Sequence, residues 1–554
     1  CLAQVGLFDT ENFGKGYGEE NDFCQRAAEA GWRNLHLLDT FVLHTGGVSF
    51  GDSKSPRERA AMETLRRLHP RYERDVMAFV QADPAQPYRL ALDIARMHQA
   101  HLPVVLAVLH DRAGGTLRHA RELALHLTEH ALFLTLTPAP DRCVRLEFAA
   151  RHEGFQLTFR LEDQYQDLVR MLTLLGVRHI HYHHLLGHDP VIMDLPSQLG
   201  VRYDFTAHDF YSFCAHISLT GKDNRYAPEL APGECACCSP QDPAPTGTGT
   251  VADWRHRNRH FLIGARLVMA PSHDTARRMA AFVPGARVRV IQHTDIADRS
   301  TAHPSQAPNP TPLRPDKPLK IAVLGALSAI KGADVLEATA LHAAQSGAPL
   351  EFHLLGYGYR HLQTQPRARL TVHGAYQDED LAGLLTWLQP DIVWFPAVWP
   401  ETYSYTLSAA MQAGLPVAVP DLGAFAERVA DRPWSWVCPW DQNAKQWVSF
   451  FTGLCTEHFA HAAAPLPSQN LLTAAPTDVW SYACDYLDGV APASSEPQRI
   501  SAEALKPYAP KPSATARSST LDTLVYMRSL PLLSGVARAI PTHWQRRVKN
   551  WLQK

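Results

Sequence analysis

The chain has 554 residues, of which 45% are hydrophobic and 19% are charged, and its 53 basic and 55 acidic residues nearly cancel. This length and composition predict a globular protein of three or four domains. The near-zero net charge argues against a nucleic-acid-binding protein, which carries a basic excess. The ten cysteines are mostly scattered, which favours a reducing compartment over a disulfide scaffold.

No run of 18 uncharged apolar residues is present, so we expect no transmembrane helix. No secretory leader is expected either. The first residue is Cys1 rather than Met, which indicates a chain that is incomplete at its N-terminus. A mature lipoprotein that begins at this cysteine is the alternative.

The first 51 residues contain an acidic cluster, Gly16-Tyr17-Gly18-Glu19-Glu20-Asn21-Asp22-Phe23-Cys24. Apolar spacing predicts a helix over Asp22 to Gly31, and a strand is expected over Asn34 to Leu38. Close carboxylates raise one another's pKa, as a general base or a metal site requires. The alternative is that the acidic residues only stabilise the start of the helix.

This block resembles the acceptor-side end of a GT-A glycosyltransferase of family 2, in which an acidic motif supplies the general base. The resemblance implies that Glu20 is the base, that Asp22 is the second acid and that His44 helps to bind a metal. An intact GT-A domain would use Mg²⁺ or Mn²⁺. The nucleotide-binding half with its Asp-x-Asp motif is absent from the sequence. We therefore expect residues 1–51 to be the C-terminal remnant of such a domain and residues 52–100 to be a helical connector.

From Pro103 onward, strands and helices alternate. Residues 103–109 read as a buried strand, followed by the turn Gly114-Gly115-Thr116 and a helix through Leu127. A glycine-rich turn between strand and helix brings backbone N–H groups near a ligand, although it is also a common form of chain reversal. The strands of this first lobe, residues 101–293, continue at 179–183, 203–206, 267–270 and 288–291.

Two groups of metal-ligating residue types lie in the first lobe. Four histidines at 181–188 (His181, His183, His184 and His188) follow one strand, but no carboxylate accompanies them in the sequence pattern, so we expect no metal there. Cys235-Ala236-Cys237-Cys238, with Cys214 upstream, departs from the C-x₂₋₄-C spacing of zinc sites. A surface loop with spare thiols is the favoured interpretation, and structural zinc is the alternative.

Residues 294–317 contain five prolines among polar residues and are expected to link two lobes. The second lobe, residues 318–490, opens with a strand over 319–324, followed by Gly325 and by Lys331 near a helix start. A lysine in that position suits a diphosphate group, and a solvated surface lysine is the alternative. Strands at 351–355, 370–373 and 391–395 complete the sheet, and Gly356 follows on the ligand side.

The segment Ile392 to Glu427 predicts a buried strand, a loop, a helix from near Glu401 to Gly414, and another buried strand. This order places Glu401 at the carboxyl end of a parallel strand, where open α/β sheets bind their ligands. A carboxylate there would repel an anion but would accept hydrogen bonds from sugar hydroxyls. The alternative is that Glu401 only favours the helix N-terminus through the helix dipole.

Pro400-Glu401-Thr402-Tyr403-Ser404, Ala410-Met411 and the Gly414-Leu415-Pro416 turn resemble the donor-site signature of the retaining GT-B glycosyltransferases of family 4. The resemblance implies an α/β fold with GT-B architecture, in which two Rossmann-like, doubly wound lobes follow the truncated end of the GT-A domain. The sequence departs from the family at two positions. Ala409 replaces a ribose-binding glutamate, and Ala326 replaces a frequent arginine.

By the same resemblance, Glu401 orients the donor sugar, Lys331 stabilises the departing diphosphate, and His208 lies beside the anomeric carbon. The expected donor-binding residues are Gly325, Lys331, Gly356, Glu401, Thr402, Tyr403 and Ser404. The expected acceptor and phosphate loop is Gly114, Gly115 and Thr116. No cofactor or metal is expected in the GT-B unit.

The implied function is that of a retaining hexosyltransferase, which moves a sugar from a nucleotide-diphosphate sugar to a glycan or lipid-linked acceptor. The implied setting is bacterial surface polysaccharide or lipopolysaccharide synthesis in the cytoplasm. Residues 491–554, a linker and a basic amphipathic tail, are expected to contact the inner face of the plasma membrane or to dock on the first lobe. The alternative functions are a non-catalytic sugar-nucleotide-binding module, favoured by Ala326 and Ala409, and a GT-B-fold epimerase or phosphorylase.

Overall fold

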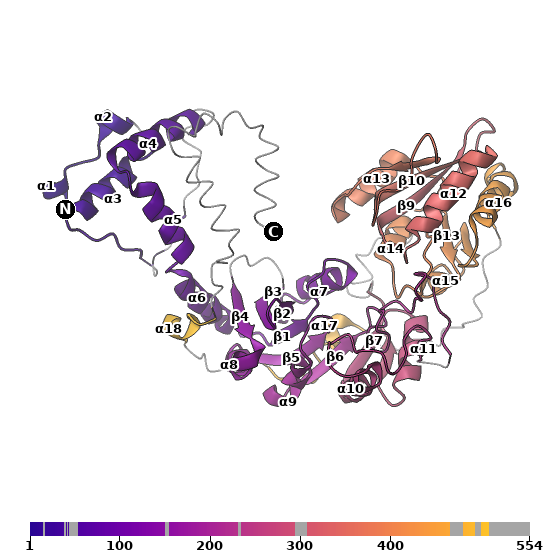
Figure 1. The fold of residues 1–554 in the computed structure, drawn as a ribbon, viewed down its shortest axis with the longest axis horizontal. Coiled ribbons are helices and arrows are strands. Elements are labelled where there is room, and N and C mark those ends of the chain that lie inside the picture. Colours follow the sequence, from indigo (N-terminus) through magenta and orange to yellow (C-terminus); the bar gives the residue numbers. More distant parts are fainter. Residues whose placement is uncertain are drawn as a thin grey trace. The chain divides into compact units, whose positions relative to one another are not determined.

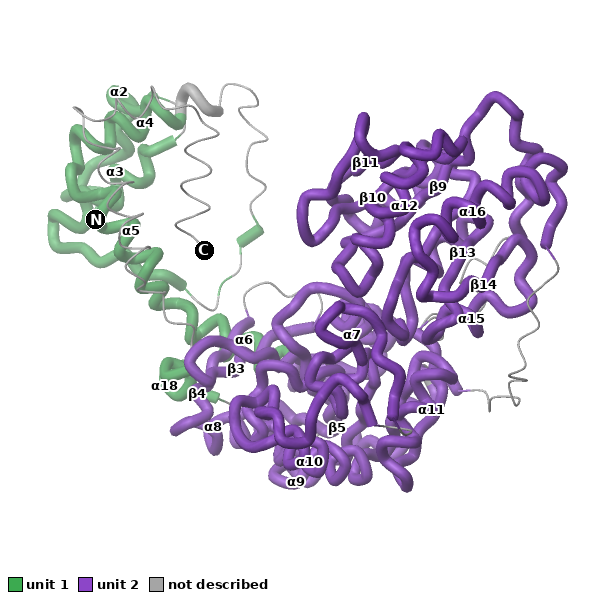
Figure 2. Tube along the Cα trace, turned by 45° about the vertical axis from the view of Figure 1, so that its right-hand side comes forward, with its two compact units in different colours: residues 1–96, 499–554 green, residues 97–498 purple. Residues whose placement is uncertain are grey.

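The chain, seen as a computed structural model, divides into two units, residues 1–96 with 499–554 and residues 97–498 (Figure 2). The structure describes residues 1–14, 17–37, 40, 42–43, 54–149, 155–230, 234–293, 307–465, 480–492 and 500–508. His44, the first part of the predicted linker and the tail over 521–554 lie outside the described residues. Within the described ranges, every helix is too short or too polar to cross a lipid bilayer.

Within its described residues, unit 1 consists of helices joined by segments without regular structure (Figure 1). Its helices are α1 (Leu2–Val5), α2 (Thr10–Phe13), α3 (Glu19–Glu29), α4 (Lys54–Leu68), α5 (Tyr72–Ala82), the first part of α6 (Gln86–Gln99) and α18 (Ala502–Leu505). Residues 34–37 form no strand, and Leu35 is exposed. The predicted strand over Asn34 to Leu38 is therefore wrong in its described part, because no neighbouring strand is present there to pair with it.

The carboxylate of Asp22 joins α3 to the end of α4. Asp22 is buried, and it accepts a hydrogen bond from Nε of Arg26 at 2.7 Å. It also pairs with Nε2 of His69 at 2.9 Å. A buried carboxylate requires such partners. Residues on both sides of the predicted boundary at residue 51 thus pack together in one helical unit.

The first lobe of unit 2 contains an eight-stranded sheet in the order β4-β3-β2-β1-β5-β6-β7-β8. The strands are β1 (Val104–Val108), β2 (Leu132–Ala139), β3 (Cys143–Phe148), β4 (Gln156–Arg160), β5 (Val177–Tyr182), β6 (Arg202–Thr206), β7 (Leu267–Ala270) and β8 (Val288–Val290). Every residue of β1 is buried, as expected for a parallel strand covered on both faces. The sequence pattern missed β2 and also β3 and β4, which extend the sheet beyond β2 in antiparallel pairing.

The second lobe contains a six-stranded, fully parallel sheet in the order β11-β10-β9-β12-β13-β14. The strands are β9 (Leu319–Leu327), β10 (Leu350–Gly358), β11 (Leu370–Val372), β12 (Ile392–Trp394), β13 (Val417–Pro420) and β14 (Ser435–Cys438). Counted within the lobe, this is the 3-2-1-4-5-6 order of a doubly wound nucleotide-binding fold. The α/β prediction of two Rossmann-like lobes is confirmed.

Helices connect the strands of both sheets (Figure 1). In the first lobe these are α7 (Gly115–His126), α8 (Leu161–Leu174), α9 (Leu195–Leu199), α10 (Val251–Gly264) and α11 (His273–Phe282), with a 3₁₀ turn at Pro190–Asp194. In the second lobe they are α12 (Ala333–Ser346), α13 (Leu381–Leu388), α14 (Tyr405–Gln412), α15 (Phe425–Arg428) and α16 (Ala444–Leu454). A 3₁₀ turn at Asp378–Asp380 precedes α13, and a π-turn at Cys455–Phe459 follows α16.

The segment around α17 (Tyr482–Asp485) packs in the core of the first lobe, together with Val105 of β1 and Met269 of β7. The hydroxyl of Tyr486 meets Nδ1 of His181 at 2.8 Å. The guanidinium of Arg266 donates to the carbonyl of Tyr486 at 2.8 Å. The predicted second lobe, 318–490, therefore differs from the observed one, because the chain returns to the first sheet before residue 490.

This packing predicts that Tyr486→Ala destabilises the first lobe selectively. Removal of a fully buried aromatic ring costs about 3–5 kcal/mol of unfolding free energy. Thermal unfolding should show the loss, and hydrogen exchange should place the lost protection in β1, β5 and β6. The exposed Tyr359→Ala is the matched control. Loss of protection confined to the second sheet would contradict this assignment of the segment.

Candidate functional site

A cleft of about 2610 Å³ opens where the two sheets of unit 2 present the carboxyl ends of their strands. Its walls come from the loops after β1 and β6 in the first lobe and from the loops after β9 and β12 in the second. Strands β1 and β9 lie where each strand order reverses direction. Such switch points are where doubly wound sheets bind their ligands.

The cleft brings together all the site residues that were predicted within the GT-B unit. These are Gly114, Gly115, Thr116, His208, Gly325, Lys331, Gly356, Glu401, Thr402, Tyr403 and Ser404. Ala326 and Ala409, the two departures from the family pattern, also line it. Glu20 and Asp22 belong to unit 1, and His44 lies outside the described residues.

Glu401 lies in the loop between β12 and α14, and its side chain is nearly buried. One carboxylate oxygen, Oε1, accepts a hydrogen bond from Nε1 of Trp399 at 3.3 Å. The same oxygen lies 3.7 Å from Nζ of Lys331, whose side chain is about half exposed. The carboxylate is thus held in a fixed place, while the ammonium group reaches the open cleft.

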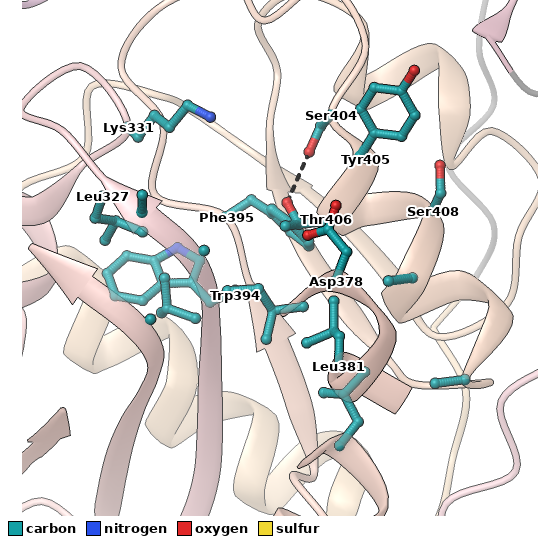
Figure 3. Close-up of a pocket in the computed structure, with 18 of the residues that line it drawn as sticks. Leu327, Lys331, Asp378, Leu381, Trp394, Phe395, Ser404, Tyr405, Thr406 and Ser408 are labelled. Carbon is teal, nitrogen blue, oxygen red and sulfur yellow. Dashed lines mark hydrogen bonds between the residues drawn. The ribbon is translucent and has the colours of Figure 1, made fainter. Parts of the chain in front are cut away.

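Helix α14 begins at Tyr405, so the prediction of a helix start near Glu401 was wrong. Ser404 is the N-cap, and its Oγ accepts a hydrogen bond from the backbone N–H of Leu407 at 3.3 Å. A short hydroxyl side chain caps a helix better than glutamate does. Ser404, and not Glu401, therefore caps the helix. Figure 3 shows Lys331 on one side of the pocket, with Ser404, Tyr405 and Ser408 on the other.

Two glycines allow the backbone to approach closely beneath these loops. A Cβ atom on Gly423 would lie 2.5 Å from the carbonyl oxygen of Glu401, and the φ angle of Gly423 is +68°. A Cβ atom on Gly356, at φ +135°, would lie 2.0 Å from the carbonyl oxygen of Gly325. Only glycine tolerates both the positive φ and the contact. Because it has no Cβ atom, Gly356 of β10 can lie close to the backbone at the end of β9, and it also lines the cleft.

The loop that carries Glu401 also contacts the first lobe directly. The hydroxyl of Thr402 donates to the backbone carbonyl of His208 at 2.6 Å. The ring of Tyr403 lies 4.7 Å from that of His293, measured between centroids. The sequence-predicted residues Glu401 and His208 are thus brought together by a hydrogen bond between their loops.

The Gly114-Gly115-Thr116 turn faces the second lobe at Tyr405. A Cβ atom on Gly115 would lie 3.5 Å from the Tyr405 ring. One turn along α7, the guanidinium of Arg118 lies over the same ring at 4.4 Å. Arg118 also donates to Asp378 at 3.1 Å, although both side chains are exposed. Such exposed pairs stabilise weakly, so the stacked ring is the firmer contact.

The sequence analysis missed Arg428, which holds the loop between β12 and α14. Its guanidinium donates to the carbonyls of Tyr403 and Ser404 at 2.6 and 2.7 Å and to Oγ of Ser408 at 2.7 Å. It also stacks on the Tyr403 ring at 4.1 Å. Burial lowers the pKa of this guanidinium. Its position in a short helix after a glycine turn gave no signal of this role.

The neighbouring Glu427 was missed as well, and it spans the two lobes. Its two carboxylate oxygens accept hydrogen bonds from the backbone N–H groups of His273 at 2.8 Å and Asp274 at 3.1 Å. These N–H groups begin helix α11 of the first lobe, where a carboxylate is favourable. Burial raises the pKa of Glu427 to about 7, although the two N–H donors oppose this shift.

Two histidines, His208 and His293, form the floor of the cleft on the first-lobe side, and the buried His119 and His183 pack against them. The ring centroids of His119 and His293 are 4.0 Å apart, and Nδ1 of His183 meets Nε2 of His208 at 3.1 Å. Burial lowers the pKa of His119 to about 3 and holds the pKa values of the other three well below their usual range. The floor is polar but uncharged. His119 and His293 escaped the sequence analysis because no motif surrounds them.

Buried carboxylates do accompany the histidines that begin in β5, contrary to the sequence-based expectation. His179 pairs with Asp204 at 3.0 Å, and His184 pairs with Asp209 at 2.8 Å. The carboxylates follow 25 residues later on the neighbouring strand β6 and the loop after it. Sequence spacing does not show such a pairing, because the strand register creates it.

Two groups of described residues have metal-ligating atoms close together. The first is His119, His183 and His208, and the second is Cys214, Cys235, Cys237 and Cys238, with all ligand atoms of each group within 4.8 Å of one another. The histidine group has three neutral rings and no carboxylate. In the cysteine group three side chains are buried. Three of the thiols that were predicted to be spare in a surface loop are thus buried, and each lies close to other thiols.

A scan against protein-family models and a search of curated proteins found no match. Solved structures with a similar fold include HepE from Anabaena in complex with UDP and glucose, at 13% identity and a TM-score of 0.42, covering 65% of this chain and 92% of that one. Sucrose-phosphate synthase from Thermosynechococcus elongatus matches at 15% identity and 0.40, covering 64% and 90%. The pneumococcal O-GlcNAc transferase GtfA, in complex with UDP and GlcNAc, matches at 9% and 0.41, covering 64% and 93%. Similarities this low say nothing about activity.

The histidine cluster predicts that the first lobe loses stability in acid. Histidine titrates near pH 6.5 in an unfolded chain, whereas the pKa of buried His119 is about 3. Between those values the unfolded chain binds a proton that the folded chain excludes. The free energy of unfolding therefore falls with decreasing pH by up to about 1.4 kcal/mol per pH unit for each such ring. Above pH 6.5 this stabilisation is fully present.

His119→Phe tests this expectation, because it replaces one titrating ring and its two unpaired nitrogens with an apolar ring. Urea unfolding across the pH range should show a slope reduced by about 1.4 kcal/mol per pH unit between pH 6.5 and 4.5. The curves of variant and parent should run parallel above pH 7. An unchanged slope in the acid range would show that His119 is not responsible.

Proposed function

We propose that unit 2 is a retaining glycosyltransferase. It moves a hexose from a nucleotide-diphosphate sugar to a glycan or lipid-linked acceptor. The observation that carries the proposal is the meeting of Glu401, Lys331 and His208 in one cleft between two doubly wound sheets. Bacterial surface polysaccharide synthesis in the cytoplasm remains the proposed setting, on the family resemblance alone.

The second lobe is the proposed donor side. Its strand order is that of nucleotide-binding folds, and its switch point lies between β9 and β12. Lys331 follows β9, and its ammonium group is about half exposed beside the cleft. A lysine there can form charge-assisted hydrogen bonds with a diphosphate. Ala326 leaves this end with one cation fewer than the family pattern, which makes Lys331 the more important.

Glu401 is the proposed partner of the donor sugar. Its carboxylate is nearly buried and accepts a hydrogen bond from Trp399 on one oxygen, Oε1. The other oxygen is available to accept hydrogen bonds from sugar hydroxyls. Phosphate oxygens that carry no proton could not donate such bonds. The ammonium of Lys331 balances the charge at 3.7 Å. In this proposal the sugar lies beside Glu401, and the diphosphate lies beside Lys331.

In the proposed reaction, the bond between the anomeric carbon and the diphosphate oxygen breaks, and the electron pair leaves with the diphosphate. The acceptor oxygen forms its new bond on the same face, and its proton passes to the departing diphosphate. Lys331 stabilises the negative charge that develops on the leaving group. The floor formed by the buried rings of His208 and His293 carries no charge that would compete with it.

A non-catalytic sugar-nucleotide-binding module is the second candidate. The alanines at 326 and 409 favour it, because each leaves the cleft without a polar group that the family uses on the nucleotide side. Both candidates bind a nucleotide sugar, and only one turns it over. Incubation of the full chain with a panel of nucleotide sugars, followed by mass spectrometry of transferred or released sugar, separates them. An epimerase would instead change the sugar while it stays attached to the nucleotide.

Glu401→Gln should retain the fold and lose transfer. The amide exchanges one acceptor oxygen for a donor, and a charged hydrogen bond of this type is worth about 1.5–3 kcal/mol, which is roughly a ten- to hundredfold loss in kcat/KM. The matched control is Glu457→Gln, an exposed residue outside the cleft. An unchanged kcat/KM in the Glu401 variant would remove this residue from the mechanism.

Lys331→Met should weaken the binding of a nucleoside diphosphate. Loss of a charge-assisted contact predicts a roughly ten- to hundredfold increase in Kd, measured by calorimetry with UDP, GDP and ADP. Lys445→Met removes an exposed lysine of α16 and serves as the control. Equal affinity of the Lys331 variant and the parent would place the diphosphate elsewhere.

A further inference from the structure

The four clustered cysteines come from the long connection between β6 and α10. Cys214 closes the turn that follows the cleft-lining His208 and Asp209. Cys235, Cys237 and Cys238 approach it from a later part of the same connection. The described part of this connection contains no helix or strand of its own. Long segments without secondary structure need some other constraint to hold a single conformation.

The sulfur positions match a tetrahedral metal site. Sγ of Cys214 lies 3.4 Å from Sγ of Cys237 and 4.0 Å from Sγ of Cys238, and the last two are 3.7 Å apart. Four thiolates at about 2.3 Å from a central Zn²⁺ would stand about 3.8 Å from one another. A disulfide would require about 2.05 Å, and all four cysteines are free.

A buried arginine points at this cluster. Nη2 of Arg255 donates to Sγ of Cys235 at 2.9 Å, and its Nε donates to the carbonyl of Phe213 at 2.8 Å. Arg255 is 8% exposed as a whole residue, and a buried guanidinium needs nearby negative charge. Neither a neutral thiol nor a carbonyl supplies it. Four thiolates around Zn²⁺ carry a net charge of about −2. Such a complex explains why Arg255 is buried and why its guanidinium points toward the cysteine sulfurs.

We propose that Cys214, Cys235, Cys237 and Cys238 bind one structural Zn²⁺ ion. Four protein sulfurs fill a tetrahedral coordination shell and leave no open position, which is the arrangement of a structural rather than a catalytic zinc site. The C-x-C-C spacing departs from the usual motif, because the fourth ligand is supplied by Cys214 of the earlier turn. This proposal does not depend on the proposed function, since no cysteine of the cluster lines the cleft.

The zinc ion would fix one wall of the cleft. Residues 216–218 follow Cys214 directly and line the cleft. Further along the same connection, the backbone N–H of Tyr226 donates to the carbonyl of Val398 in the second lobe at 2.8 Å. The side chain of Asn258 donates to the carbonyl of Ser212 at 2.8 Å. A metal between the two segments would hold these contacts in place, and metal binding energy becomes folding energy.

Elemental analysis of the purified full chain tests the proposal. We expect one zinc per chain, which survives dialysis and is released when a thiol-modifying reagent is added. Cys214→Ser and Cys238→Ser should each lose zinc and lower the melting temperature. Cys143→Ser, on strand β3 of the first lobe, and Cys438→Ser, buried in the second lobe, are the matched controls and should keep it.

Cobalt substitution gives a readout that does not depend on the stability of the variants. Co²⁺ bound by four thiolates should show sulfur-to-cobalt charge-transfer absorption and the intense visible bands of tetrahedral cobalt. Three observations would each overturn the proposal. They are a folded wild-type chain without zinc, a disulfide among the four cysteines, and zinc that persists in Cys214→Ser but is lost in His119→Phe. The last result would place the metal on the histidine group.

Discussion

The hydrogen bond from the Thr402 hydroxyl to the His208 carbonyl, at 2.6 Å, fixes the geometry on which the cleft depends. It joins the loop after β12 in one sheet to the loop after β6 in the other. Glu401 immediately precedes Thr402, so its carboxylate is positioned relative to the first lobe as well as to its own. Arg428 and the close approach of Gly423 hold the same loop from the opposite side. A loop that is already held in one conformation needs little free energy for ordering when a ligand binds.

The two sides of the cleft differ in charge, and the difference has a physical origin. On the first-lobe side, four histidine rings are too deeply buried to be protonated near neutral pH. On the second-lobe side, Lys331 keeps its contact with solvent and stands against Glu401. A ligand with a neutral, hydroxyl-rich end and an anionic end suits such a division. The buried nitrogens of His119 have no hydrogen-bond partner among the described residues, which is a cost in stability that a site, rather than a core, commonly carries.

Much of this arrangement could be predicted from the sequence. Buried apolar runs placed β1, β9 and β12, because fully covered parallel strands have a continuous hydrophobic pattern. Local motifs placed Glu401 and Lys331 after the right strands. The start of α14 was misplaced because the capping hydroxyl of Ser404 outweighs the acidic residue three positions earlier. The buried strand β2 was missed, and so were β3 and β4, whose half-exposed antiparallel pattern is weaker.

Contacts between distant segments could not be predicted, because the fold alone creates them. Three such contacts join residues that no local pattern relates. They are the return of Tyr486 to the first sheet, the pairing of His179 with Asp204, and the hydrogen bonds of Arg428 to the loop between β12 and α14. The cysteine cluster is a partial case. The sequence analysis grouped Cys214 with the cysteines of 235–238, but the unusual spacing favoured spare thiols, and only the folded chain shows that the four sulfurs meet.

The central claim is that a nucleotide sugar binds across the cleft, with its diphosphate near Lys331. Hydrogen exchange of the full chain, with and without saturating UDP, GDP or ADP, tests it most directly. The account predicts that one of these nucleotides protects residues 325–333 and 399–408 together, and that its sugar conjugate extends the protection to residues 112–118. Protection confined to other segments, with binding demonstrated independently, would contradict it.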